Sequence, residues 1–117
     1  MPKSLGKKLL KRYKRQRAHN GFSDYDCFSL DCYLFELIPN AMDHLASFKN
    51  SYSPIMWMYD AGEEKQVTAE EYDDELHHVA SEFRRGADMI QHFEEEGDEI
   101  IQRCFAWLGH NIGTLWD

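Results

Sequence analysis

Two adjacent histidines that follow a run of acidic residues form the first pattern in the sequence that could hold a metal. Glu75 and His78 are three residues apart, the spacing at which di-iron helical bundles place a glutamate and a histidine on one helix face. That chemistry needs the unit twice, with two further carboxylates from facing helices, and His44, His92 and His110 have no acid three residues before them. We therefore interpret the segment as a solvated acidic face with local acid–histidine contacts, and expect no metal or cofactor.

A second group of carboxylates has the spacing of a magnesium site. It resembles the magnesium-binding acids of all-α nucleotide pyrophosphohydrolases, and its members are Glu70, Glu71, Asp74, Glu95 and Asp98. Paired acids on facing helices would hold Mg²⁺ against the phosphates of a substrate. A glycine interrupts the second part of the pattern, and a strongly acidic chain produces such spacings by chance. The sequence has no nucleophile motif or glycine-rich phosphate loop, so we expect no catalytic residue and keep the Mg²⁺-dependent hydrolase as an alternative.

The basic residues are concentrated at the beginning of the chain. The formal net charge is −8, yet eight of the 13 basic residues precede Gly21, where no acid occurs, and the rest of the chain carries five basic and 21 acidic side chains. Such a cationic segment can bind phosphates without sequence preference; the candidate residues for nucleic acid are Lys7, Lys8, Lys11, Arg12, Lys14, Arg15 and Arg17. Alternatively, Leu5, Leu9, Leu10 and Tyr13 dock on the helical body and the lysines neutralise its acids.

The segment from residue 50 to residue 64 is too apolar for an ordinary solvated loop, because it contains Met56, Trp57, Met58 and Tyr59 in succession. Either it folds over the core, or it forms an exposed apolar patch that binds a partner. The candidate partner-binding residues combine this segment with acids of the body, and they are Tyr52, Trp57, Met58, Tyr59, Asp73, Asp74, Glu94, Glu95 and Glu96.

Four helices are expected to position these residues. Apolar spacing predicts a short amphipathic helix over 5–17, and a longer one from the capping sequence at Ser23–Asp26 to Phe48, with a kink or break near Pro39. A capping box at Thr68–Glu71 begins a third helix that reaches Phe93, and a last helix follows Gly97 and carries apolar residues from 100 to 116. Within it, the glycine pair at 109 and 113 would permit close helix approach, or is incidental.

The fold class is therefore all-α, a compact bundle or orthogonal array of about four helices without a strand. Apolar residues make up 43% of the chain, enough to form one core. The charge divides it into a basic amphipathic arm, residues 1–20, and a single acidic helical domain, residues 21–117.

The cysteines and the first residues indicate a cytosolic protein. Cys27, Cys32 and Cys104 are an odd number without metal-binding or redox spacing, and we interpret them as reduced core residues. The beginning of the chain lacks the apolar region of a signal peptide, and no apolar run approaches a membrane-spanning length. We expect no membrane partner.

Several short motifs are shared with a known group of proteins. They are Gly21-Phe22-Ser23-Asp24, Asp26, Ser29-Leu30-Asp31, Ile38-Pro39, Leu45, Glu71-Tyr72 and the terminal Leu115-Trp116-Asp117. With these motifs the chain resembles, from about Arg12 to its end, a widespread family of small uncharacterised bacteriophage proteins. It departs from their pattern at residues 51–54 and at Tyr72, where tryptophan is more usual. The resemblance implies a phage origin, the cytoplasm of the infected host and a helical fold, but no particular activity.

These observations favour a small phage-encoded binding protein. It would inhibit or modulate a host or defence protein by stoichiometric binding, as an anti-CRISPR or other anti-defence inhibitor does, and its acidic body would complement a cationic nucleic-acid-binding surface. The alternatives are a nucleic-acid-associated accessory protein that acts through the basic arm, and the Mg²⁺-dependent nucleotide pyrophosphohydrolase.

Overall fold

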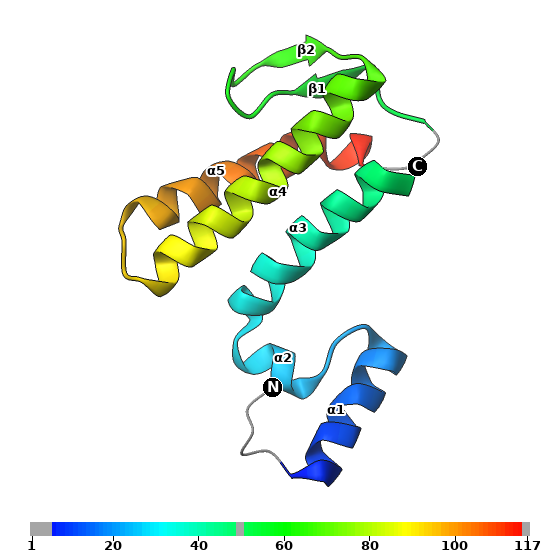
Figure 1. Cartoon of the computed structure of the whole chain (residues 1–117), viewed down its shortest axis with the longest axis vertical. Helices are drawn as coiled ribbons and strands as arrows, with labels where there is room; N and C mark the ends of the chain where they lie inside the picture. The colour runs from blue at the N-terminus through cyan, green and yellow to red at the C-terminus, as the bar shows by residue number, and fades with distance from the viewer. Residues whose placement is uncertain (1–5, 49–50, 116–117) are drawn as a thin grey trace. The chain divides into compact units, whose positions relative to one another are not determined.

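The computed structural model describes residues 6–48 and 51–115, which form helices and one small hairpin. In chain order the elements are α1 (Lys7–Asn20), α2 (Asp24–Phe28), α3 (Leu30–Phe48), β1 (Ile55–Trp57), β2 (Glu64–Gln66), α4 (Ala69–Gln91), α5 (Glu96–Asn111) and the 3₁₀ turn η1 (Ile112–Thr114) (Figure 1). The predicted all-α fold class is confirmed. Among the described residues, no helix combines the length and the apolar character needed to cross a bilayer.

The chain divides into two compact units, Met1–Leu34 and Phe35–Asp117. The predicted division into a basic arm, residues 1–20, and an acidic domain, residues 21–117, was based on charge, and it stays a prediction. Leu5 and Trp116, which were assigned to the first and last helices, lie outside the described residues, as does the terminal Asp117.

The first unit is built on a helix that ends at a glycine. Gly21 has a φ of 85°, a left-handed conformation that favours glycine, and its N–H donates to the carbonyl of Arg17 at 2.9 Å. A capping box at Ser23 and Asp26 then begins α2, as predicted. Tyr13 is buried, with its ring centroid 5.6 Å from that of Tyr25. The contact joins α1 to α2.

The predicted break in the second helix occurs at Ser29 rather than at Pro39. Ser29 has φ −141° and ψ 67°, which separates α2 from α3, and its carbonyl accepts the first hydrogen bond of α3 from Tyr33 at 3.1 Å. Serine is suited to this position because its side chain competes with helical hydrogen bonding. α3 continues through the buried Pro39 to Phe48, so the proline does not end the helix.

In the second unit, α4 and α5 lie side by side and run antiparallel (Figure 1). Two glycines allow the close approach: a Cβ on Gly86 would lie 2.9 Å from Ile100 Cγ2, and one on Gly97 would lie 2.9 Å from the carbonyl oxygen of Gly86. Gly109 and Gly113 have open space around them. Their predicted spacing is therefore incidental, and the close contact lies at the other end of α5.

A two-stranded antiparallel hairpin completes the second unit and corrects the prediction that the chain has no strand. Met56 pairs with Lys65 in its centre, and Gly62 forms the turn with a φ of 69°. Met56 and Tyr59 are 1% and 4% exposed, so the apolar segment folds over the core. The core that it covers is formed by Met42, Val67, Tyr72, Leu76, Val79, Ala80, Phe83, Ile100, Ile101, Cys104 and Trp107.

Candidate functional site

The predicted aromatic patch is part of the folded core rather than a continuous surface. Tyr59 is buried, and the Arg103 guanidinium lies 4.4 Å from its ring centroid. Trp57 is half-buried and stacks on His110 at a centroid distance of 4.4 Å and an interplanar angle of 8°. Met58 is half-buried, as is Tyr52, whose ring lies 6.2 Å from that of Tyr72. The ring of Tyr59 is therefore inaccessible to a partner.

Asn111 and Glu75 hold the aromatic segment in place. Sequence patterns did not identify Asn111, and they indicated a solvated rather than a buried role for Glu75. Asn111 accepts the backbone N–H of Trp57 at 2.9 Å and donates to its carbonyl at 2.8 Å. Glu75 accepts the backbone N–H of Tyr59 at 2.7 Å and the indole N–H of Trp107 at 3.0 Å. Both are buried. A glutamate in an acidic run gives no sequence signal for burial, because its donors come from residues 16 and 32 positions away.

The two halves of the predicted Glu-x-x-His unit do not converge on one site. Glu75 faces the core, whereas His78 contacts Asp60 at 3.2 Å on the surface. The adjacent His77 contacts Asp43 at 2.6 Å, and Arg84 forms an ion pair with the same carboxylate at 2.6 Å. The local acid–histidine contacts expected within α4 are replaced by contacts with distant acids, which join His77 to α3 and His78 to the hairpin. The interpretation of Glu75 as a solvated acid is wrong.

The pKa of Asp43 is set by two opposing effects, burial and hydrogen bonding. Partial burial raises the pKa of its carboxyl, while the hydrogen bonds from His77 and Arg84 lower it by more, so that the pKa lies below its ordinary value. Together these contacts attach the second half of α3 to α4. In the described part of the chain, no group of three or more histidine, cysteine or acidic side chains is placed to hold a metal ion.

The predicted acids form two separate surfaces. Asp73 and Asp74 lie near the beginning of α4, whereas Glu94, Glu95 and Glu96 lie at the connection from α4 to α5. At a rise of 1.5 Å per residue, about 30 Å of helix separates the two sets. A similar distance separates the two parts of the magnesium pattern, because Glu70 and Glu71 lie in the first turn of α4, whereas Glu95 directly precedes α5 and Asp98 lies in its first turn. These acids cannot share one Mg²⁺ ion.

We name the exposed acids Glu94, Glu95, Glu96 and Asp98 the loop-end acidic surface. They have no ion-pair partner in the part of the chain that the structure describes. The exposed Glu63, Glu64 and Glu70 lie near the opposite end of α4, at β2 and the helix start. The loop-end acidic surface therefore carries negative charges that no ion pair within the described chain neutralises.

The basic residues of α1 fall into two groups. Arg12 and Arg17 form ion pairs with Asp24 and Asp26 of the same unit. The other basic side chains of α1 are exposed and have no ion-pair partner among the described residues; they are Lys7, Lys8, Lys11, Lys14 and Arg15. At 3.6 residues per turn, they occupy one face of α1, opposite the buried Tyr13. We call them the α1 basic face.

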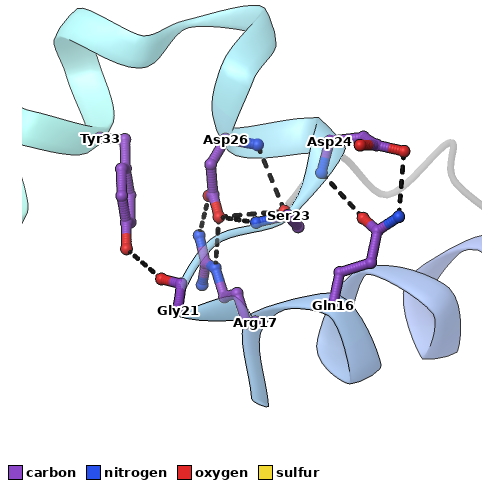
Figure 2. Close-up of polar contacts among 7 residues, drawn as sticks. All are labelled: Gln16, Arg17, Gly21, Ser23, Asp24, Asp26 and Tyr33. Atoms are coloured by element: carbon purple, nitrogen blue, oxygen red, sulfur yellow. Dashed lines mark hydrogen bonds and ion pairs between the residues drawn. The ribbon is translucent and has the colours of Figure 1, made fainter. Parts of the chain in front are cut away.

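A polar network fixes α1 against α2 (Figure 2). Asp26 accepts from Arg17 Nε at 2.8 Å, from the Ser23 backbone at 2.7 Å and from its hydroxyl at 3.0 Å. The Arg17 hydrogen bond, followed by those from Ser23, holds the pKa of Asp26 well below its usual range against the opposing effect of burial. Arg17 is thus engaged in the fold, although it belongs to the candidate nucleic-acid-binding set.

Three further hydrogen bonds complete this network. Gln16 donates to Asp24 Oδ2 at 3.0 Å and accepts the backbone N–H of Asp24 at 2.8 Å, while the Tyr33 hydroxyl donates to the carbonyl of Gly21 at 2.7 Å (Figure 2). The α1 basic face is therefore presented by a helix whose inner side is fixed by specific hydrogen bonds.

Comparison with protein-family models, curated proteins and solved structures finds no significant match to this chain.

Proposed function

We propose that the chain is a small phage-encoded binding protein that inhibits or modulates a host or defence protein by stoichiometric contact, as an anti-CRISPR or other anti-defence inhibitor does. The observation that supports this function best is the charge of the second unit. Residues 35–117 carry eighteen acidic and five basic side chains, and the loop-end acidic surface is exposed and unpaired within the described chain.

An acidic surface without ion pairs favours one type of binding partner. It repels nucleic acid and attracts a positively charged protein surface, and the attraction accelerates association and selects the partner. Proteins that bind nucleic acid carry such cationic surfaces. A small acidic protein that binds such a cationic surface blocks it against DNA or RNA without any catalytic step. Each inhibitor molecule then inactivates one target molecule.

A capture experiment tests this function. The tagged chain is incubated with lysate of the bacterial host, with and without nuclease, and the bound proteins are quantified by mass spectrometry. We expect one protein at near-equimolar ratio whose recovery is independent of nuclease. Recovery that disappears with nuclease would contradict the proposal, as would the absence of any stoichiometric protein.

Matched charge variants locate the contact on the second unit. Glu94→Gln, Glu95→Gln and Glu96→Gln together remove three exposed charges at the loop end, and Glu63→Gln, Glu64→Gln and Glu70→Gln remove three near the other end of α4. We expect the first triple variant to weaken capture about tenfold or more and the second to weaken it much less. Equal effects would assign binding to overall charge rather than to one surface.

Association with nucleic acid through the first unit is the second candidate, and the α1 basic face favours it. Five unpaired cations on one helix face would release counterions when they contact phosphates, so the affinity would fall steeply with salt. The test is fluorescence anisotropy of a labelled duplex at several salt concentrations. A variant with Lys7, Lys8, Lys11, Lys14 and Arg15 each changed to Gln should lose most of the salt slope. Binding unaffected by these changes would exclude this role of the face.

A further inference from the structure

Phe93, between α4 and α5, has the most exposed large apolar side chain in the described part of the chain, with 95% of its surface accessible. Its φ is 58°, and it alone among the described non-glycine residues has a positive φ. Its N–H donates to the carbonyl of Ile90 at 3.0 Å, and the next N–H, of Glu94, donates to Met89 at 2.9 Å. This is a helix-ending turn in which glycine is the usual residue at that position.

The fold does not use the phenyl ring of Phe93. A ring that is 95% exposed contributes almost no buried area, and a left-handed backbone is unfavourable for a residue with a Cβ. Glycine would form the same turn without this strain and without an exposed aromatic group. The backbone of Phe93 therefore costs the isolated chain stability, and its ring contributes almost nothing in return.

The surroundings of Phe93 specify the kind of partner that would bury it. Glu94, Glu95 and Glu96 follow it directly, and the loop-end acidic surface forms no ion pair within the described chain, although Glu94 helps to raise the pKa of the nearby His92. The face of an aromatic ring also attracts cations. Ring and carboxylates thus favour the same complement, in which lysine or arginine side chains border an apolar pocket.

We propose that Phe93 is the apolar anchor of the loop-end acidic surface, and that its ring enters a pocket bordered by lysine or arginine on a cationic protein partner. The inference rests on the proposed function and adds the residue through which it acts. Interfaces concentrate their binding energy in a few central aromatic or arginine side chains, surrounded by polar contacts that exclude water. Here the ring would be the centre and the glutamates the surrounding contacts.

The substitution Phe93→Gly distinguishes two roles of Phe93, as a binding anchor or as a residue that stabilises the fold. It should raise the midpoint of thermal unfolding by a few degrees, because the turn loses its strain, and it should weaken capture of the stoichiometric protein from nuclease-treated host lysate about 30-fold. Phe93→Tyr keeps the aromatic ring and should retain capture. Ile112→Ser is the matched control, since Ile112 is 67% exposed beyond the opposite end of α5, and it should leave capture unchanged.

Poly-L-lysine serves as a second probe, because it offers positive charge without a pocket. Phe93→Gly should bind it as the wild type does, whereas the triple Glu→Gln variant at positions 94–96 should bind it more weakly. If Phe93→Gly lowers the unfolding midpoint, or captures the lysate protein as well as the wild type, the anchor is refuted while the proposed function stands. If the wild type captures no stoichiometric protein, the proposed function fails and the anchor with it.

Discussion

The indole N–H of Trp107 donates to the carboxylate of Glu75 at 3.0 Å, from the C-terminal part of α5 to the N-terminal part of α4. The same carboxylate oxygen accepts the backbone N–H of Tyr59 at 2.7 Å, so one buried side chain joins both long helices to the end of the hairpin. A buried carboxylate is costly without such donors. Glu75 therefore stabilises the second unit only as long as both donors are in place.

Glu75→Gln should lower the free energy of unfolding by about 1–3 kcal/mol, because hydrogen bonds to a charged acceptor are replaced by weaker neutral ones. Urea denaturation measures the change. Glu70→Gln on the exposed side of α4 is the control and should change it by less than about 0.5 kcal/mol. In a double-mutant cycle, Glu75→Gln with Trp107→Phe should show a coupling above about 0.5 kcal/mol. If the effects of the two substitutions are additive, the hydrogen bond between Trp107 and Glu75 makes no measurable contribution to stability.

Asp26 should make the first unit sensitive to acid. Its pKa is depressed in the folded chain, so its stabilising effect is fully present above the unfolded value of about 4 and is lost as the pH falls towards the folded value. The protection factors of the α1 amides, which compare the observed exchange with the intrinsic rate at the same pH, should therefore fall below about pH 4. Asp26→Asn should weaken protection by about 2 kcal/mol already at pH 7 and flatten the pH dependence. Asp24 is exposed and its contacts with Arg12 and Gln16 lie at the surface, so Asp24→Asn should weaken protection by less than about 1 kcal/mol. An effect equal to that of Asp26→Asn would contradict this role of Asp26.

The glycines of α5 should respond to alanine with opposite signs. Gly97→Ala places a Cβ 2.9 Å from the carbonyl oxygen of Gly86 and 2.9 Å from the backbone nitrogen of Ile90. Because backbone atoms cannot move aside easily, we expect a loss of about 1–3 kcal/mol. Gly109→Ala meets nothing within 4 Å and should gain about 0.5–1 kcal/mol from the lower entropy of the unfolded chain. Thermal unfolding of both variants measures the difference, and the same sign for both would contradict this packing.

The cysteines should react at different rates. Cys27 and Cys32 are exposed, which corrects the prediction that all three are core residues; only Cys104 is buried. Burial raises the pKa of the Cys104 thiol to about 11. Since the thiolate is the reactive form, an aromatic disulfide reagent at pH 8 should modify two thiols of the native chain rapidly and the third only after denaturation. Rapid modification of all three would show that the core opens easily.

Local sequence signals predicted most of the helices. The capping boxes at Ser23 and Thr68 begin α2 and α4 as expected, because a cap depends on residues only three positions apart. The apolar spacing of α4 and α5 also identified the faces that form the core. The resemblance to phage proteins, and the origin it implies, stays a prediction.

The features that sequence analysis missed depend on distant contacts or on a single backbone angle. The strands have three residues each, too short for an alternating pattern to show. The burial of Glu75 depends on donors from the hairpin and from α5. Phe93 was assigned to the apolar face of the third helix, but α4 ends at Gln91 and the left-handed turn directs the ring into solvent.

Quantitative capture from nuclease-treated host lysate, carried out in parallel with three chains, tests whether the acidic second unit binds a host protein. They are the wild type, the variant with a neutralised α1 basic face and the variant with Gln at positions 94–96. We expect the first two chains to recover the same protein at near-equimolar ratio, and the third to recover at least about tenfold less of it. Loss of capture with the neutralised α1 face, and retention with the neutral loop end, would contradict this expectation.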